Sequence, residues 1–416
     1  MIAYPACAMT DAAAPIEQLL IDLMRAPDSV AGERLAALDA ANRDALVGLA
    51  RRSRCAPYLA HVLDTRGDFA LPDGLHALRE RGMFRALAIG RECAHIHAML
   101  ADAGIDHVFL KGVALAFRDY AQPWMRPMRD IDILIEPGRL DDAYSLLHRA
   151  GGGIERFAHV PPEMQRDGKH LPPVHSPGRV VPVELHYRML SPKLALPAAA
   201  LAHLEAAVWQ GRERVRIGEA DVPVPRDEIL LAHLLIHGML DHELNNGPLF
   251  LADLVALLRA RPPHRERWVA LVERTGLQHM VALAASMLPG DAREALAVDA
   301  ASVTVVDDAT VRALMFQPER YRAQVKVMAS LADDRIGSRV ALAARKLFVS
   351  RAALTGQWRF EGHAPGTEPR SMIGFRLWYM ATKLRQFFRR RSRSEDATLQ
   401  SLRRFRAQLS APPGDA

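Results

Sequence analysis

The chain has 416 residues, of which half are hydrophobic and a quarter charged, so it has ample apolar content for a core and does not have the composition of a disordered protein. Its formal net charge of +6 arises largely in the C-terminal tail, so the charge does not make the whole chain a nucleic-acid-binding protein. Its three cysteines form no C-x-x-C pair, which argues against a disulfide framework or a zinc knuckle.

Amphipathic helices are predicted for the first hundred residues, where apolar residues recur at helical spacing. The clearest are Ala14 to Met24 and a long helix from Leu75 to Ala103, for which Gly104 is the expected C-cap. No stretch reaches the roughly 18 apolar residues of a membrane span, and the first residues lack the pattern of a signal peptide. We therefore expect a cytoplasmic protein whose residues 1–103 form a helical region.

A strand followed by a glycine turn is predicted next. The segment HVFL, His107 to Leu110, has a β-type composition, and the VALAFRDY segment beyond it has a helical pattern. Lys111 and Gly112 lie between the two. A glycine here lets backbone N–H groups approach a phosphate at the start of the helix, and Lys111 adds a positive charge for the same phosphate. A Lys-Gly pair alone is weak evidence for a phosphate site.

The second predicted strand, DIDILIE, carries two aspartates. Residues i and i+2 of a strand share a face, so Asp130 and Asp132 point the same way, about 6.5–7 Å apart along the backbone. Neighbouring carboxylates raise each other's pKa, and a divalent cation removes that cost. Mg²⁺ prefers carboxylate oxygens together with water and phosphates, so the pair predicts a Mg²⁺ site. The alternative is a half-buried edge strand whose acids face solvent.

A third strand is predicted within RVVPVELHYRM, where apolar and polar residues alternate so that Glu184 and His186 share a face. Three carboxylates with two metal ions are the arrangement that clamps the attacking and leaving oxygens in phosphoryl transfer. For His186 two interpretations stay open, contact with a phosphate or metal and packing against a backbone carbonyl. His170 and His175, which precede this strand, are expected to be solvent-exposed loop residues, with an approach to the active site as the alternative.

These motifs together resemble a known family. In their order and spacing, LKG, RPMRDIDILI and VELH resemble the bacterial uncharacterised nucleotidyltransferase family, within the DNA polymerase β-like nucleotidyltransferase superfamily. The resemblance implies an α+β fold, with a small mixed β-sheet core embedded in a mostly helical chain. It implies that Asp130, Asp132 and Glu184 are catalytic residues that bind two Mg²⁺ ions. It also implies that Gly112 is the glycine of the nucleotide turn and Arg126 the arginine ahead of D-I-D.

The nucleotide-binding residues expected from the motifs and the resemblance are Lys111, Gly112, Arg126, Arg129 and His186. The expected reaction moves a nucleoside monophosphate from an NTP, such as ATP, to an acceptor hydroxyl that the sequence does not identify. The broad superfamily has Gly-Ser at the turn where this chain has Lys-Gly, which leaves the details of phosphate binding open. A non-catalytic nucleotide sensor or adaptor on the same fold is the alternative function.

The catalytic core is expected at residues 104–190 and a helical domain at residues 191–354, with the substrates between them. Asp227 is the expected N-cap of a helix that runs to His242. Two histidines four residues apart on this helix have a spacing that suits a metal, but the glutamate of the zincin motif H-E-x-x-H is missing. The roles of four polar residues stay open, namely those of His233, His237, His242 and Asp253.

Residues 355–416 are predicted to form a connector, a basic amphipathic helix and a flexible tail. The amphipathic helix, Ile373 to Phe388, is followed by the basic run RRRSRS. We expect the helix to dock its aromatic residues on the helical core, namely Trp378, Tyr379 and Phe387. Peripheral contact with an anionic membrane or with nucleic acid is the alternative.

Overall fold

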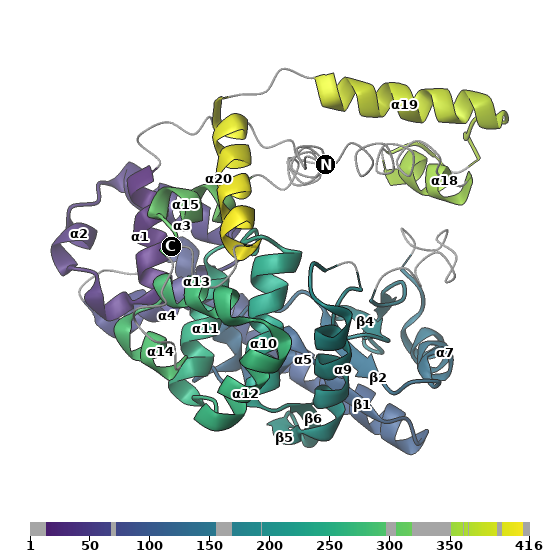
Figure 1. The fold of residues 1–416 in the computed structure, drawn as a ribbon, viewed down its shortest axis with the longest axis horizontal. Coiled ribbons are helices and arrows are strands. Elements are labelled where there is room, and N and C mark those ends of the chain that lie inside the picture. The colour runs from purple at the N-terminus through teal and green to yellow at the C-terminus, as the bar shows by residue number, and fades with distance from the viewer. Residues whose placement is uncertain are drawn as a thin grey trace.

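The structure of the protein is a computed structural model (Figure 1). It describes residues 14–67, 72–154, 169–192, 194–296, 305–317, 351–360, 362–364, 366–388 and 393–410. These residues form an α+β fold, in which a mixed four-stranded sheet lies within a mostly helical chain. The fold class expected from the sequence is therefore confirmed.

The helices ahead of the sheet follow the apolar periodicity of the sequence. They are α1 (Ala14–Arg25), the 3₁₀ helix η1 (Pro27–Ser29), α2 (Gly32–Ala36), α3 (Ala40–Arg52), α4 (Ala56–Arg66) and α5 (Asp73–Asp102). Gly104 adopts a φ of +62° just beyond α5, a left-handed conformation that glycine reaches without strain. The N–H of Ile105 donates to the carbonyl of Leu100 and closes the helix end. The predicted C-cap is therefore wrong by one residue, because Ala103 occupies the cap and Gly104 follows it.

The sheet has the strand order β1-β2-β4-β3. Its strands are β1 (His107–Phe109), β2 (Ile131–Ile135), β3 (Val174–His175) and β4 (Pro182–His186). β1 is antiparallel to β2, β2 is parallel to β4, and β3 is antiparallel to β4. Between the strands lie α6 (Lys111–Arg118), the 3₁₀ helix η2 (Pro123–Met125) and α7 (Leu140–Gly151). The parallel pairing is possible because α7 and the chain beyond it return β4 to the same end of the sheet.

One face of β2 is part of the hydrophobic core, as its alternation predicts. Ile131, Ile133 and Ile135 are at most 1% exposed. Asp132, which lies between the first two, points to the other face and is itself only 4% exposed. A carboxylate buried to this degree requires charged or hydrogen-bonding partners, which identifies this face as the one to inspect for a site.

A β-hairpin interrupts the expected helical domain at residues 191–354. After α9 (Ala198–Gln210), strands β5 (Arg212–Ile217) and β6 (Ala220–Pro225) pair antiparallel around a turn in which Gly218 has a φ of +59°. The helix prediction is wrong here because the apolar residues of RERVRI alternate with charged ones, a period of two that places Val215 and Ile217 in the core.

The helices beyond the hairpin form the main helical body (Figure 1). They are α10 (Asp227–Ile236), a π-helical turn (His237–Asp241), α11 (Leu249–Ala260), α12 (Arg265–Thr275), α13 (Gln278–Ser286), α14 (Gly290–Ala295) and α15 (Asp308–Met315). The predicted N-cap of α10 is wrong by one residue, because Arg226 occupies the cap and Asp227 begins the helix. An acidic residue in the first turn still interacts favourably with the helix dipole.

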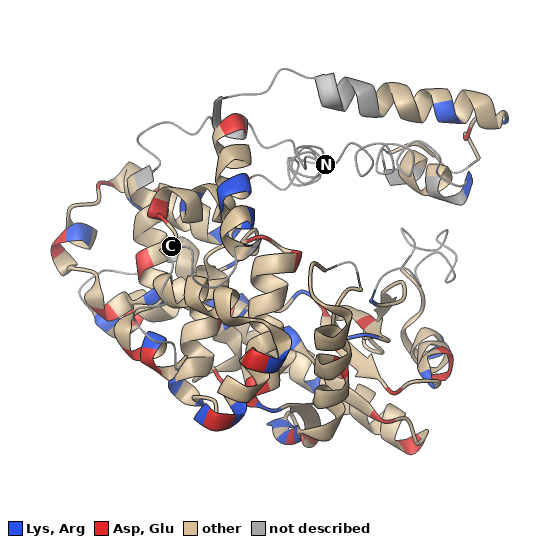
Figure 2. Ribbon diagram, in the orientation of Figure 1, with Lys and Arg blue, Asp and Glu red and all other residues tan. Residues whose placement is uncertain are grey.

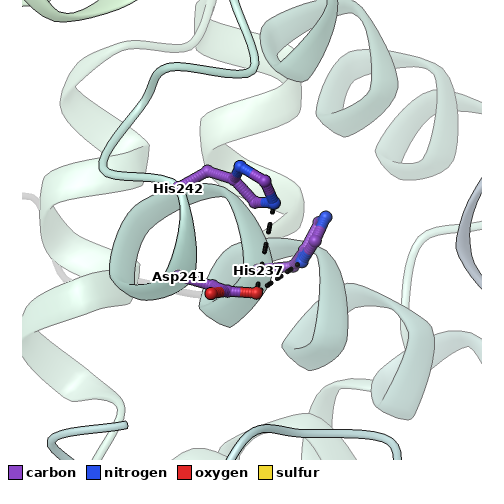
Figure 3. Close-up of side chains that lie close together, drawn as sticks. All are labelled: His237, Asp241 and His242. Atoms are coloured by element: carbon purple, nitrogen blue, oxygen red, sulfur yellow. Dashed lines mark ion pairs between the residues drawn. The ribbon is translucent and has the colours of Figure 1, made fainter. Parts of the chain in front are cut away.

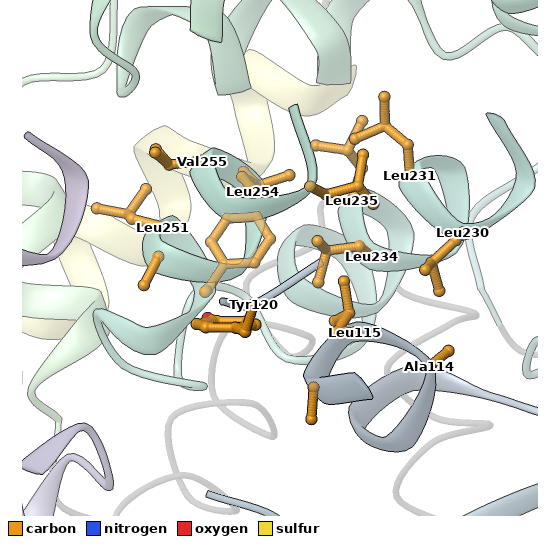
Figure 4. Close-up of a cluster of buried hydrophobic side chains, with 14 of the residues drawn as sticks. Ala114, Leu115, Tyr120, Leu230, Leu231, Leu234, Leu235, Leu251, Leu254 and Val255 are labelled. Atoms are coloured by element: carbon orange, nitrogen blue, oxygen red, sulfur yellow. The ribbon is translucent and has the colours of Figure 1, made fainter. Parts of the chain in front are cut away.

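The helical body packs directly on the helix that follows β1 (Figure 4). Ala114 and Leu115 of α6 lie against Leu230 and Leu234 of α10, and all four are at most 7% exposed. Tyr120, just beyond α6, lies beside the leucines of α11 in the same cluster. This apolar contact fixes the position of α10 and α11 relative to the turn at the start of α6.

The N-terminal helices pack on the same body. α1 contacts α11 and α15 as well as α3 and α4. A single cluster of buried hydrophobic residues contains members from the N-terminal helices, the sheet and the helical body, among them Leu20, Ile133 and Leu254. The expected division at residues 103, 190 and 354 stays a prediction.

The described residues of the C-terminal region form three helices, α18 (Arg351–Phe360), α19 (Met372–Phe388) and α20 (Arg393–Ser410). The expected connector is therefore partly helical. Trp378 and Tyr379 of α19 belong to a small separate cluster with α18, so in the part of the chain described here α19 docks on α18. The side chain of Phe387 and residues 411–416 lie outside the described residues. α20 instead docks on α13 and α15, with Leu402 and Phe405 in the main core.

Acidic and basic residues are interspersed along the helices of the body (Figure 2). No helix among the described residues combines the length and the apolar character required to cross a membrane. The basic run after α19 falls mainly at residues 389–392, outside the described part of the chain.

Candidate active site

The predicted acidic residues of the two parallel strands are direct neighbours. Asp132 on β2 is the register partner of Glu184 on β4. Asp130 lies two residues ahead of Asp132, at the entrance to β2. Burial and the charges of Asp132 and Glu184 raise the pKa of Asp130 to about 6. The three carboxylates therefore share one electrostatic environment, as expected from the sequence.

Lys111 is the first residue of α6 and holds a conformation that is unusual for a lysine. Its φ is +47°, in the left-handed region, so the strained residue of the Lys-Gly turn is the lysine rather than the glycine. Its ammonium Nζ lies 2.5 Å from Oδ1 of Asp132. Burial opposes the charged ammonium, but the carboxylates of Asp132 and Glu184 outweigh burial and raise the pKa of Lys111. A charged lysine thus lies at the centre of the acidic group.

His186 is fully buried and is bonded to the same aspartate. Its Nε2 lies 2.8 Å from Oδ1 of Asp132, and its Nδ1 lies 3.2 Å from the backbone carbonyl of Arg188. Of the two interpretations left open by the sequence, the contact with a backbone carbonyl is present, and contact with a phosphate or metal stays a prediction. Although burial acts in the opposite direction, Lys111 and His186 hold the pKa of Asp132 well below its usual range.

The donor atoms of Asp132, Glu184 and His186 all lie within 4.8 Å of one another, close enough to bind a common metal ion. Two carboxylates and an imidazole are a donor set that divalent cations accept. Asp130 is not in this set of three, although the charges of Asp132 and Glu184 contribute to its raised pKa. The imidazole of His186, expected to contact nucleotide, is the third member of the set.

Arg126 forms a buried link between the motif and the helical body. Its Nε and Nη2 donate to the two carboxylate oxygens of Asp253 on α11, at 2.8 and 2.9 Å. The hydroxyl of Tyr120 donates to the same aspartate at 2.7 Å. A Cβ atom on Gly112 would lie 2.6 Å from Nη1 of Arg126, so the glycine is required for this close approach. Arg129, by contrast, is exposed.

Two residues ahead of β3, Lys169 and His170, lie at the site. His170 was expected to be exposed, but its Nε2 lies 3.5 Å from Oε2 of Glu184 and its side chain is only 29% exposed. It is brought there by a β-bridge to His186. Lys169, next to it, has its Nζ 2.6 Å from Oδ2 of Asp241 in the π-helical turn. The residue pattern of one segment cannot predict such a bridge, because His186 is distant from His170 in the sequence.

Three histidines of α10 and the π-helical turn, whose roles the sequence leaves open, lie close to the site lysines or to Asp241. His233 on α10 is 1% exposed, and among the described residues neither of its ring nitrogens has a hydrogen-bond partner. Burial, together with the nearby charges of Lys111 and Lys169, holds the pKa of His233 well below its usual value. A neutral, unpaired imidazole therefore lies between α6 and the π-helical turn. His237 and His242 flank Asp241 in that turn (Figure 3).

A pocket lies away from these residues. It has a volume of about 490 Å³ and is lined by His97, His107 and Arg212, beside the beginning of β1. Lys111 follows the other end of that strand. The cavity is therefore separate from the acidic site.

Comparison with known proteins agrees with the motif. A family model described as "Uncharacterised nucleotidyltransferase" matches residues 39–289, which is more than half of the chain and includes every candidate site residue named above. No curated protein and no solved structure gives a significant match. The chain therefore belongs to the uncharacterised nucleotidyltransferase family, which supports nucleotidyl transfer as its general function.

Proposed function

We propose that the protein transfers a nucleoside monophosphate from an NTP to an acceptor hydroxyl in a Mg²⁺-dependent reaction. The observation that carries the proposal is the pairing of Asp132 with Glu184 across β2 and β4, with Asp130 and Lys111 beside them. In the reaction the acceptor oxygen bonds to the α-phosphorus, the bond to the β-phosphate oxygen breaks, and pyrophosphate leaves.

The residues present are suited to Mg²⁺. Asp130, Asp132 and Glu184 supply the hard oxygen donors that this ion prefers. The raised pKa of Asp130, at about 6, reflects burial and repulsion from the other two carboxylates, and a bound cation relieves that repulsion. We propose that these three residues hold two Mg²⁺ ions, which supply positive charge beside the reacting phosphates.

The remaining residues have proposed roles in binding and orientation. Lys111 balances the phosphate charge, and the Gly112 backbone approaches the phosphates at the start of α6. His186 holds the carboxylate of Asp132 in place and lies beside the nucleotide. Glu184 accepts the proton of the acceptor hydroxyl, because its carboxylate is ionised at neutral pH. Burial opposes the ionised form, but the nearby imidazoles of His186 and His170 and the ammonium of Lys111 outweigh it and lower the pKa of Glu184.

Two arginines are proposed to contact the nucleotide in different ways. Arg126 commits Nε and Nη2 to Asp253, so only its Nη1, beside Gly112, is oriented towards the turn. Arg129 is exposed and is proposed to reach the phosphates of a bound nucleotide. Arg126 would therefore contact the nucleotide only through Nη1 while it positions the turn, whereas Arg129 would contact the nucleotide from an exposed position.

The direct test is transfer of label from an α-phosphorus-labelled NTP to acceptor fractions, with the Asp132→Asn variant as the blank. Label must appear in a product with the wild type and not with the variant, and pyrophosphate must be released in equal amount. Equal labelling by both proteins would refute the assignment.

A further inference from the structure

The π-helical turn after α10 brings three potential metal ligands onto one side of the chain. The N–H of His242 donates to the carbonyl of His237 at 3.0 Å, the i to i+5 bond that defines a π turn. In a regular α-helix residue i+4 lies near residue i, but residue i+5 is rotated away. The wider turn places both Asp241 and His242 beside His237 (Figure 3). Such turns occur frequently at functional sites.

We propose that His237, Asp241 and His242 bind a divalent transition-metal ion of the zinc class, at a site separate from the acidic residues of β2 and β4. The proposal does not depend on nucleotidyl transfer. Two imidazoles and one carboxylate are the ligands that zinc accepts, and three protein ligands leave a fourth position for water or substrate.

The spacing of the donor atoms fits one ion. Ligand atoms at tetrahedral corners, about 2.1 Å from zinc, lie about 3.4 Å from one another. Nδ1 of His237 is 3.3 Å from Oδ2 of Asp241, and Nε2 of His242 is 4.0 Å from the same oxygen. The rings of the two histidines have their centroids 4.2 Å apart. Small side-chain rotations are enough to bring the three atoms to a common ion.

Unpaired imidazole nitrogens provide independent support. Nδ1 of His237 is buried and makes no hydrogen bond among the described residues, although Oδ2 of Asp241 lies 3.3 Å away. His233, one turn earlier, has both ring nitrogens unpaired and its ring centroid is 6.0 Å from that of His237. A buried polar group without a partner costs free energy, so a ligand that bonds to these nitrogens would stabilise the region.

The charged groups around the proposed site include one ligand and two cations. The carboxylate of Asp241 lies beside both imidazoles. Lys111 and Lys169 are the cations that act on His237. Nζ of Lys169 lies 2.6 Å from Oδ2 of Asp241. A bound metal ion would share this carboxylate with the ammonium group or displace it.

Metal titration of the chelator-treated full-length protein tests the proposal. Zn²⁺ affinity is measured by competition with a fluorescent chelator, and Co²⁺ absorption in the visible range reports the ligand geometry. His237→Ala and His242→Ala are each expected to weaken Zn²⁺ binding by more than about 100-fold, the upper end of what the loss of a supporting partner costs. The matched control is His264→Ala, an exposed histidine ahead of α12, which should bind as the wild type does.

Two further variants separate this site from the acidic one. Asp132→Asn must retain the histidine-dependent Zn²⁺ site, and Lys169→Met should tighten Zn²⁺ binding about tenfold because the competing ammonium is gone. Circular dichroism of each variant checks that it folds. The proposal is overturned if both histidine variants bind Zn²⁺ like the wild type, or if Asp132→Asn alone removes all binding.

Discussion

Asp132 and Glu184 face each other as register partners across a parallel strand pair, although α7 and a β-bridged segment separate them in the chain. Parallel neighbours present their side chains in step, so residues opposite each other share a face of the sheet. Lys111 and His186 then converge on Asp132 from α6 and from β4. Asp132 is therefore the residue on which the other groups of the site depend.

Replacing Asp132 with asparagine should abolish transfer while the fold persists. The substitution keeps the size of the side chain but removes the charge that balances Lys111 and would hold a metal. We expect transfer to fall by at least about 100-fold, the scale seen when one preorganised electrostatic group of an active site is removed. The measurement is label transfer together with urea unfolding. The control is Asp142→Asn, an exposed aspartate on α7 that should leave transfer unchanged.

The link between Arg126 and Asp253 should be important for stability. Arg126→Ala leaves the buried Asp253 carboxylate with the Tyr120 hydroxyl but without its cation, and breaking such a pair costs about 3–5 kcal/mol. Arg129→Ala, three residues away and exposed, should change the free energy of unfolding by less than about 0.5 kcal/mol. Urea unfolding of both variants checks the difference, and equal losses would show that the pair is not a structural link.

Gly112→Ala should disturb the turn through Arg126. The added Cβ would lie 2.6 Å from Nη1, and the guanidinium cannot move freely because Asp253 holds its other nitrogens. We expect a loss of about 1–3 kcal/mol, as for other overpacked positions. Gly290→Ala is the control, because at the start of α14 a Cβ meets no atom within 4 Å. A loss no larger than that of the control would mean that the arginine yields without cost.

Acid should destabilise the protein through His107 on β1. Burial, opposed in part by a bond to the Ile105 carbonyl, lowers the pKa of His107 to about 4. The folded protein then binds fewer protons than the unfolded chain between about pH 6.5 and about pH 4, so stability falls as the pH falls through that window. The contribution is at most about 3 kcal/mol for a shift of this size.

His107→Gln should make this pH dependence shallower, as measured by urea unfolding at several pH values within the window. The exposed His264 provides the control, because His264→Gln should leave the slope as it is in the wild type. An unchanged slope in His107→Gln would show that other groups cause the acid sensitivity.

The sheet and its acidic residues could be predicted from the sequence because they depend on local periodicity. The alternation of DIDILI sets the face of each residue, and the burial of Ile131, Ile133 and Ile135 confirms it. The hairpin β5–β6 was missed because its charged, short strands read as part of an alanine-rich helical region. The end of the long helix could be predicted to within one residue, because a glycine that adopts a left-handed conformation, Gly104, follows it.

The remaining parts of the site depend on contacts between distant segments. The pairing of Arg126 with Asp253, and of Lys169 with Asp241, joins residues that no local pattern relates. The π-helical turn is likewise set by packing, since a Cβ on Gly238 would lie 2.3 Å from Phe250. Sequence periodicity predicts the elements, whereas these tertiary contacts determine which side chains meet.

The central claim is tested most directly by isothermal titration of non-hydrolysable NTPs, with and without Mg²⁺, into the wild type and the Asp130→Ala/Asp132→Ala variant. The account predicts Mg²⁺-dependent binding of at least one NTP to the wild type and its loss in the double variant, with folding unchanged. Absence of binding for every NTP, or equal binding to both proteins, would contradict the nucleotide site and favour an adaptor function instead.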